Sequence, residues 1–443
     1  MIPEEIGVES YIMQLENTIE ILITENETLK GENESLKKKL LLYENPHTPP
    51  SRQMITTKIA NPPGKRGAPL GHKGATKVLG DPDEAIHVST ETCPECGHVL
   101  GSPLRTEKKT IFDIPPPQKI KVTEYDLDIY KCSNCGIEVR SKHINCPQTG
   151  DMGIYLLNYI TMLKYNLRGP VRKVQEFMRD NNDLDLSVKG ISDALLRVGD
   201  ACKNEYIGIQ NRIRRSKWVH IDETGFHVNG EKFWLWAFRS AENDVLITVV
   251  DSRGRDVVKD TLGEEFNSPV IVDGWKAYSY LKTIQRCWAH LIREVDAFMH
   301  IDHGKELSEE IYNMFKELKE SLKSEDMDER KSVKITYEKR MEELVKRYDP
   351  YRELHKPVEY IRNGLGSWFT CLLYPGMEPT NNFAEQAIRE HVVIRKIIGT
   401  FRSESGSQNY QYISSLLSTW RLQNKSMFVE MDKILRKELC GFN

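Results

Sequence analysis

The sequence predicts a multidomain α+β protein, and three observations support this fold class. Hydrophobic residues repeat in heptads near the N-terminus, two Cys-x-x-Cys-Gly motifs follow a stretch rich in Pro and Gly, and the hydrophobic period changes from helical to strand-like at Lys217. The chain has 443 residues, which predicts about two to four domains. Its apolar runs fall short of the ~20 residues that span a bilayer, which excludes a membrane protein.

Charge and cysteine content restrict the function classes further. The formal net charge is −3, but it averages a basic linker against acidic helices, so it does not exclude nucleic acid as a partner. The N-terminus lacks the basic and apolar regions of a secretion signal, and nine cysteines in a chain of this length are not a disulfide scaffold. We therefore expect a protein of the reducing cytoplasm.

Residues 10–45 are predicted to form a coiled coil of the leucine-zipper type. Two seven-residue series run through this region, with Leu at most d positions. The a and d positions are Ile12, Leu15, Ile19, Leu22, Asn26, Leu29, Asn33, Leu36, Leu40 and Tyr43. Asn at two a positions is typical of a parallel dimer, so a homodimer or higher oligomer is expected. The alternative is a single amphipathic helix docked on the rest of the chain.

Residues 46–84 are expected to be an extended linker. Up to Gly80 this stretch is rich in Pro, Gly, Lys and Arg and contains no Asp or Glu. Pro and Gly at this density disfavour helix and strand. Lys65, Arg66 and Lys73 are candidate DNA contacts, because basic arms lie along phosphates or in a minor groove. A merely solvated linker is the alternative.

Residues 85–148 are predicted to form a small zinc-binding β module. The motif cysteines are Cys93, Cys96, Cys132 and Cys135. Four thiolates at this spacing satisfy a tetrahedral Zn²⁺ in a closed structural site. The residues from Ile120 to Ile129 alternate as in a strand. A redox pair is disfavoured, because no βαβ pattern surrounds either motif.

Residues 150–215 are predicted to form a helical domain that binds DNA. Short helices joined by tight turns are compatible with a helix-turn-helix, and ordinary helical packing is an equal alternative. Gly169-Pro170 is expected to separate the first two helices, and Ser187 is expected to cap the third.

An α/β core is predicted to follow, at 216–300 and 365–420. Three strands joined by turns at Asn229-Gly230 and Asn243 precede a helix, a fourth strand, a helix near Trp275–Leu281 and a fifth strand. Three antiparallel strands followed by βαβα is the order of a ribonuclease-H-like fold. The predicted strands are 218–222, 232–238, 244–250, 270–272 and 284–287, with a helical insertion at 301–364 and a C-terminal helix at 421–443.

Two acidic residues follow strands that lie side by side in such a fold. Asp222 is expected at the end of the first strand, and Asp273 at the end of the fourth. Two buried carboxylates repel each other unless a cation relieves them, and hard oxygen ligands favour Mg²⁺ or Mn²⁺. Either Asp alone could simply cap a turn, but the pair predicts a metal site.

Five short motifs carry a family resemblance. They are HIDET at 220–224, DGWKAY at 273–278, CWAH at 287–290, TNNFAE at 380–385 and GTFRS at 399–403. Together with the zipper, the basic arm and the Cys motifs, they make the chain resemble transposases of the insertion sequence 66 family over nearly its whole length. The resemblance implies that Asp222, Asp273 and Glu385 form an Asp-Asp-Glu catalytic triad. Periodicity alone would not single out Glu385.

The resemblance also implies a function. We expect a DNA transposase that cleaves the 3′ ends of an insertion sequence and transfers them to target DNA, using two Mg²⁺ or Mn²⁺ ions beside one structural Zn²⁺. Its partners would be transposon ends, target DNA and accessory proteins, in the nucleoid of a prokaryotic cytoplasm. Candidates for phosphate positioning are His290, Arg389, Arg395, Lys396 and Arg402. Trp275 and Trp288 are expected to be packing residues rather than base-stacking ones.

Two other interpretations are compatible with the sequence. One is a DNA-binding regulator with an inactive ribonuclease-H-like domain, and the other is a plain nuclease that cuts without joining. Retention of all three carboxylates disfavours the regulator. The nuclease would leave the zipper and the basic arm without an obvious role.

Overall fold

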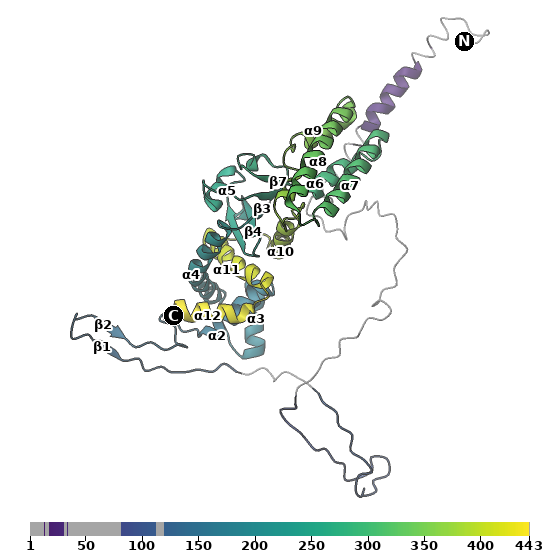
Figure 1. Cartoon of the computed structure of the whole chain (residues 1–443). Coiled ribbons are helices and arrows are strands. Elements are labelled where there is room, and N and C mark those ends of the chain that lie inside the picture. Colours follow the sequence, from purple (N-terminus) through teal and green to yellow (C-terminus); the bar gives the residue numbers. More distant parts are fainter. Residues whose placement is uncertain (1–12, 14–16, 31–32, 34–80, 112–118, 443) are drawn as a thin grey trace. The chain divides into compact units, whose positions relative to one another are not determined.

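The computed structural model describes residues 13, 17–30, 33, 81–111 and 119–442. The chain forms two units, Met1–Ile114 and Pro115–Asn443. The second unit carries the main sheet and the helices from α2 onward (Figure 1). Within the described ranges, no helix is both long and apolar enough to cross a membrane.

The first unit contains a helix over residues 17–30. The heptad residues Ile19, Leu22 and Leu29 are each more than half exposed on it. Most of the remaining predicted coiled coil, and the linker up to Gly80, lie outside the described residues. Helix formation at 17–30 agrees with the heptad pattern, while pairing of the helix with a second one stays a prediction.

The Cys-containing module has less strand than the sequence predicts. Within 85–111 and 119–148, the named strands are β1 (Ile129–Lys131) and β2 (Glu138–Arg140), which pair antiparallel. The strand expected to begin at Ile120 is wrong, because Ile120 and Val122 are exposed and unpaired among the described residues. Alternating side chains stabilise a strand only where a neighbouring strand and a core receive it.

Six helices pack together beside the main sheet (Figure 1). They are α2 (Ile154–Thr161), the π-helix η2 (Met162–Asn166), α3 (Val171–Asn182), α4 (Val188–Ile213), α11 (Glu404–Leu422) and α12 (Met427–Cys440). The break at Gly169-Pro170 is confirmed, since α3 begins directly after Pro170. The Ser187 cap is also confirmed, because its Oγ accepts a hydrogen bond from the Gly190 N–H at 2.9 Å.

The main sheet has five strands in the order β5-β4-β3-β6-β7. They are β3 (Val219–Val228), β4 (Glu231–Ser240), β5 (Val245–Val250), β6 (Val270–Val272) and β7 (Ile284–Arg286). The first three are antiparallel, and β6 and β7 run parallel to β3. Asn229 and Gly230 both take positive φ, so the two-residue hairpin predicted between β3 and β4 is confirmed.

The connections between the last strands differ in part from the prediction. Helix α5 (Arg255–Leu262) precedes β6, as expected. The helix expected near Trp275–Leu281 is only the short 3-10 turn η3 (Lys276–Tyr278). The segment between β6 and β7 is too short to hold a full helix, because it must also return the chain for the parallel pairing of these two strands.

The outer edge of the sheet at β5 is covered by side chains of α11. Ser415 Oγ accepts a hydrogen bond from the Ile247 N–H at 2.8 Å, and Thr419 Oγ1 accepts one from the Val245 N–H at 2.9 Å. An open strand edge presents unpaired backbone groups that can recruit another chain. The α11 hydroxyls therefore take the place of a further strand.

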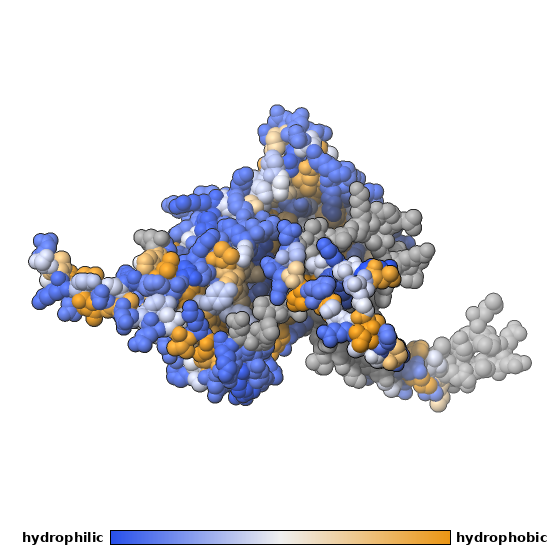
Figure 2. Space-filling view, turned by 90° about the horizontal axis from the view of Figure 1, so that it is seen from below, coloured by the Kyte–Doolittle hydropathy of each residue, from blue (hydrophilic) through white to orange (hydrophobic). Residues whose placement is uncertain are grey.

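Two hydrophobic cores lie against opposite faces of the sheet. Val270 and Val272 of β6 belong to the core shared with α4, α11 and α12, while Ile271 between them belongs to the second core. The second core is built by α6 (Trp288–Asp296), α7 (Asp302–Ser321), α8 (Met327–Tyr348), η4 (Arg352–Leu354), α9 (His355–Arg362) and η5 (Thr370–Leu373). The outer surface seen in Figure 2 is mainly hydrophilic, with hydrophobic residues in separate patches.

Candidate functional site

Asp222 and Asp273 lie at equivalent positions of two neighbouring parallel strands. Val219 of β3 is opposite Val270 of β6, and each Asp follows three residues later (222 − 219 = 273 − 270 = 3). Asp273 comes directly after β6, as predicted. The expectation that Asp222 ends its strand is wrong, because β4 supplies a partner along all of β3 and the strand continues beyond Asp222.

Glu385 lies in the first turn of α10 (Asn382–Ile398). The residue before this helix, Asn381, is fully buried and ties the helix start to β3. Its Nδ2 donates to the Ile221 carbonyl oxygen at 2.7 Å, and its Oδ1 lies 3.2 Å from Nδ1 of His220. Both contacts are to residues directly before Asp222, so Asn381 brings Glu385 to the edge where the two Asp residues lie.

The sequence Thr380-Asn381 before this helix predicts that one of the two side chains caps its N-terminus, and that prediction is wrong. The N-terminus of α10 has no side-chain capping hydrogen bond, and the amide of Asn381 is used on the sheet. The backbone N–H of Asn381 points to Sγ of Cys287 at 3.1 Å, which joins the start of α6 to the same place. Sequence reasoning therefore identified this Asn as a helix signal but missed its role in positioning the site.

Asp222 is influenced electrostatically by the other two predicted catalytic carboxylates. Burial raises the pKa of Asp222 well above its usual range, and the negative charges of Glu223, Asp273 and Glu385 raise that pKa further. One hydrogen bond from the Glu223 N–H to Asp222 Oδ1, at 3.0 Å, opposes the shift. A carboxylate placed in this way is relieved by a cation.

Glu223 belongs to a buried network that the sequence analysis missed. Its side chain is 1% exposed, and its Oε1 accepts from Arg253 Nε at 2.9 Å. Its Oε2 accepts from the Tyr278 hydroxyl at 2.5 Å. The alternation of side chains along β3 puts Glu223 on the face opposite Asp222, and a buried Glu requires partners. That signal was available in the sequence, whereas the identity of the partners was not.

Glu385 is paired with Arg293 rather than with Arg389, one turn along its own helix. Arg293 Nη2 donates to Glu385 Oε1 at 2.9 Å, and no ion pair of Arg389 occurs among the described residues. The ligand atoms of Cys287, His290 and Glu385 lie within 4.8 Å of one another, the one such group of potential metal ligands in the described part of the chain. Asp222 and Asp273 stand outside that group.

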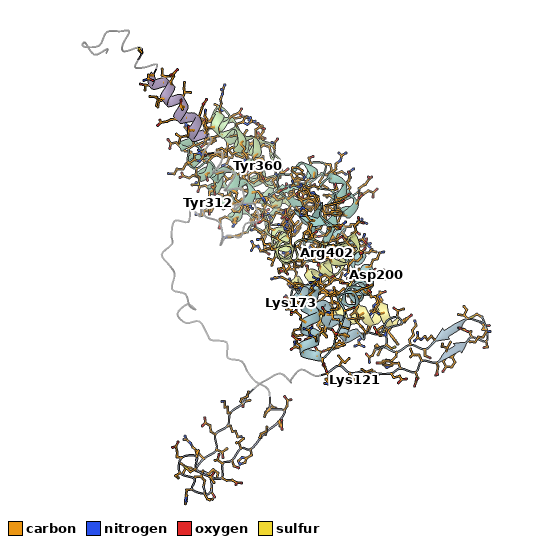
Figure 3. The ribbon with its side chains drawn as sticks, turned by 180° about the vertical axis from the view of Figure 1, so that it is seen from behind. Lys121, Lys173, Asp200, Tyr312, Tyr360 and Arg402 are labelled. Atoms are coloured by element: carbon orange, nitrogen blue, oxygen red, sulfur yellow. The ribbon has the colours of Figure 1, made fainter. Side chains whose placement is uncertain are left out.

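The predicted DNA-contact residues fall into three groups. Arg389, Lys396 and Arg402 are exposed, and Figure 3 labels Arg402. Arg395 is half-buried and donates to the Gly225 carbonyl oxygen and to Thr224 Oγ1, so its guanidinium contacts β3. His290 is half-buried, and its pKa is lowered by burial and then by the charge of Arg293. Lys65, Arg66 and Lys73 lie outside the described residues.

The two Trp residues of the site motifs behave differently. Trp288 is fully buried in the second core, as predicted for a packing residue. Trp275 is 41% exposed, so only part of its surface is packed and its expected role as a packing residue stays a prediction. The indole of Trp275 lies against the Arg253 guanidinium, whose central carbon is 4.0 Å from the ring centroid.

Each Cys motif forms a tight turn of the same kind. The Gly97 N–H donates to the Cys93 carbonyl oxygen at 2.8 Å, and the Gly136 N–H donates to the Cys132 carbonyl oxygen at 2.9 Å. Both glycines have positive φ, as the turn requires. Hydrogen bonds from backbone N–H groups within each motif lower the pKa of the Cys93 and Cys132 thiols, which favours the thiolate form that binds metal.

Comparison with known proteins gives two matches. The model of a family described as "Transposase IS66 family" matches residues 150–409, which include all three predicted catalytic carboxylates. A second model, the "zinc-finger binding domain of transposase IS66", matches residues 90–136, which include both Cys motifs, and it supports a structural zinc. No match was found among the curated proteins.

Proposed function

The chain belongs to the IS66 family of transposases, and from this premise we propose that it cleaves the 3′ ends of an insertion sequence and transfers them to target DNA. The observation that carries the proposal is the arrangement of Asp222 and Asp273 at equivalent positions of neighbouring parallel strands, with Glu385 tied to the same edge by Asn381. The strand order β5-β4-β3-β6-β7 supports a ribonuclease-H-like core.

The donor set fits a hard divalent cation. Three carboxylates are the ligands that Mg²⁺ or Mn²⁺ prefers. The pKa of Asp222 is raised first by burial and then by the charges of neighbouring carboxylates, and a cation would relieve both effects. We propose that Asp222, Asp273 and Glu385 hold two such ions. When bound, the ions would supply charge compensation for the entering and leaving oxygens of an in-line displacement at phosphorus.

The chain's own groups would position the ligands of this centre. The backbone N–H of Trp275 donates to Asp273 Oδ1 at 2.8 Å, which fixes one oxygen of that carboxylate. Arg293 holds Oε1 of Glu385 in the same way. We propose that Arg293 keeps the Glu385 side chain near the two Asp residues until the metal ions compete for it.

Exposed basic residues would bind the DNA backbone. Arg389, Lys396 and Arg402 are exposed on or beside α10, so we propose that they contact phosphates, with Lys65, Arg66 and Lys73 of the linker extending the contact. Arg395 is assigned a different role, because its contacts with β3 anchor α10 to the sheet.

The remaining parts of the chain would organise the complex. We propose that Cys93, Cys96, Cys132 and Cys135 together hold the structural zinc. The exposed heptad residues of helix 17–30 support a coiled coil over 10–45 that makes a homodimer or higher oligomer. Such a transposase would act on the nucleoid in a prokaryotic cytoplasm, with or without accessory proteins. The regulator and the plain nuclease have no observation in their favour.

A cleavage and joining assay tests this function. The purified full chain is incubated with a duplex that carries one of the inverted repeats flanking its coding region, with Mg²⁺ or with EDTA, and new 3′ ends and joined products are resolved on a denaturing gel. Mg²⁺-dependent cleavage and joining are expected, and both should be lost in Asp222→Asn and Glu385→Gln.

Glu404→Gln is the matched control. Glu404 is an exposed carboxylate in the first turn of α11, as Glu385 is in the first turn of α10, and it lies outside the triad. This variant should cleave and join like the parent. Normal strand transfer by the Asp222→Asn or Glu385→Gln variant would refute the triad.

A further inference from the structure

A cavity of about 480 Å³ opens beside Asp273 and has no role in the chemistry described so far. We call it the Asp273 cavity. Besides Asp273 itself, the polar and aromatic residues that line it include Trp275, Tyr278, Lys282, Arg286, Asn363 and Ser367. One wall is therefore aromatic, two side chains are cationic, and an amide and a hydroxyl provide hydrogen-bonding groups.

The aromatic wall is rigidly built. The Arg253 guanidinium lies between two Trp side chains, 4.6 Å from the Trp234 ring and 4.0 Å from the Trp275 ring. Arg253 is itself fixed by the buried carboxylate of Glu223 at 2.7 Å, and the Trp275 indole N–H donates to the Arg253 carbonyl oxygen at 3.4 Å. Although Arg253 covers one side of the indole, Trp275 keeps 41% of its surface exposed and lines the cavity.

The cationic side of the cavity is also fixed. The Arg286 guanidinium lies 4.9 Å from the Tyr360 ring and 5.2 Å from the Trp368 ring, and its Nε is buried without a hydrogen-bond partner among the described residues. A Cβ on Gly274 would lie 2.6 Å from Arg286 Nη2, so glycine at this position lets the Asp273 loop approach the guanidinium. Lys282 is exposed, and its Nζ donates to Asn267 Oδ1 at 2.9 Å.

We propose that the Asp273 cavity receives an unpaired nucleotide adjacent to the scissile phosphate. Its base would stack on Trp275, and its phosphate would contact Arg286 and Lys282. A flat aromatic platform and a fixed guanidinium are the two groups that recognise a single-stranded nucleotide. The inference rests on the proposed function, because a DNA end bound with its scissile phosphate near Asp273 is what brings such a nucleotide to the cavity.

Stacking is tested in a binding assay that needs no cleavage. 2-Aminopurine is placed, one position at a time, on either side of the scissile phosphate in the end duplex, and its emission is followed as full-length protein is added in EDTA. The emission should change at one of these positions with the parent and with Trp275→Phe, but not with Trp275→Ala. Tyr312→Ala is the control, since Tyr312 is an exposed aromatic residue on α7 that does not line the cavity (Figure 3).

Cleavage supplies the second measurement. Trp275→Ala should cut a fully paired end about 10- to 100-fold more slowly than the parent. On an end in which the same nucleotide is mismatched or abasic, the variant should cleave at nearly the rate of the parent. The reason is that this nucleotide is already unpaired, so the protein no longer has to stabilise its unpairing. An equal defect on paired and unpaired ends would mean that Trp275 acts on the metal site instead and would overturn the proposal.

The cationic side is tested by Lys282→Ala. Loss of one phosphate contact should reduce the slope of log binding constant against log salt by about 0.7 to 0.9. If the parent cleaves the end but no 2-aminopurine position responds, the cavity proposal fails while the proposed function stands. If emission responds through Trp275 and no end is ever cleaved, the proposed function fails while the nucleotide site stands. Absence of any DNA binding would overturn both.

Discussion

Replacing Asn381 by Ala should loosen the start of α10 from β3 without altering any predicted catalytic group, while Arg395 still holds the other end of the helix. The side chain is fully buried and makes two contacts, to the Ile221 carbonyl oxygen at 2.7 Å and to His220 Nδ1 at 3.2 Å. Burial lowers the pKa of His220 to about 4, so its imidazole is neutral at pH 7 and Nδ1 can donate a hydrogen bond to the side-chain amide oxygen Oδ1 of Asn381.

The expected loss of stability follows from these two contacts. A typical intramolecular hydrogen bond contributes about 0.5–1.5 kcal/mol, and a buried partner left unsatisfied costs about 1–3 kcal/mol. Because Ala removes one donor and one acceptor and leaves their partners buried, we expect Asn381→Ala to lower the free energy of unfolding by about 2–4 kcal/mol. For a unit of this size, that loss corresponds to a decrease in Tm of roughly 3–6 °C.

Differential scanning calorimetry of the full chain measures the shift, and end cleavage measured well below the lowered Tm gives the functional readout. Cleavage should fall because Glu385 is no longer held beside Asp222, although every ligand is present. Asn382→Ala is the matched control, since Asn382 is the exposed neighbour and should leave both Tm and cleavage unchanged. An Asn381→Ala protein with the Tm and the cleavage rate of the parent would refute the reasoning.

Three further predictions concern the charge, cap and metal sites. Asp222→Asn should stabilise the metal-free protein at pH 7 and raise its Tm, because the amide removes a charge that burial and the neighbouring carboxylates disfavour. The pKa of Asp222 is raised in the folded protein, so ionisation of this carboxyl destabilises the fold at any pH above that pKa. The stability gained by the Asn variant therefore disappears as the pH falls below the pKa of Asp222 in the unfolded chain. Calorimetry in EDTA checks this, with the exposed Asp251→Asn as control, and a destabilised Asp222→Asn protein would contradict it. Ser187→Ala should cost about 1 kcal/mol in urea unfolding through loss of the α4 cap, and Ser187→Asn should restore most of it; equal stability of all three proteins would show that the cap is unimportant. Cys93→Ser should lose the zinc measured by mass spectrometry, while Cys146→Ser should retain it, and the reverse result would require a different ligand set.

Local signals were sufficient for several features of the fold. The Asn229-Gly230 turn and the Ser187 cap depend on neighbouring backbone atoms, and both occur where the sequence predicts them. The strand predicted from Ile120 failed because alternation says nothing about whether a partner strand is present. Pattern alone therefore predicts an element best when its stabilising contacts lie within a few residues.

Prediction of the candidate site from the sequence was limited in the same way, because its contacts join residues that are far apart in the chain. Asp222 and Asp273 could be placed together because the order of strands determines which ones are neighbours. The contact between Arg293 and Glu385 could not be predicted, since 92 residues separate them and the competing i, i+4 partner Arg389 was closer in sequence. Asn381 was misassigned for the same reason, because its partners lie 160 residues away on β3.

The insertion between β7 and α10 has a consequence for the order in which a newly made chain becomes complete. Asp222 leaves the ribosome 163 residues before Glu385 (385 − 222 = 163). At about 5–20 residues per second, the interval is roughly 8–33 s. During that time the predicted coiled coil, the predicted linker and the zinc-finger region at 90–136 have already emerged, while the contact of Asn381 with β3 cannot yet form. Under the proposed function, the segments proposed to contact DNA are therefore made before the catalytic centre can form, and every product truncated before Asn381 would lack that centre.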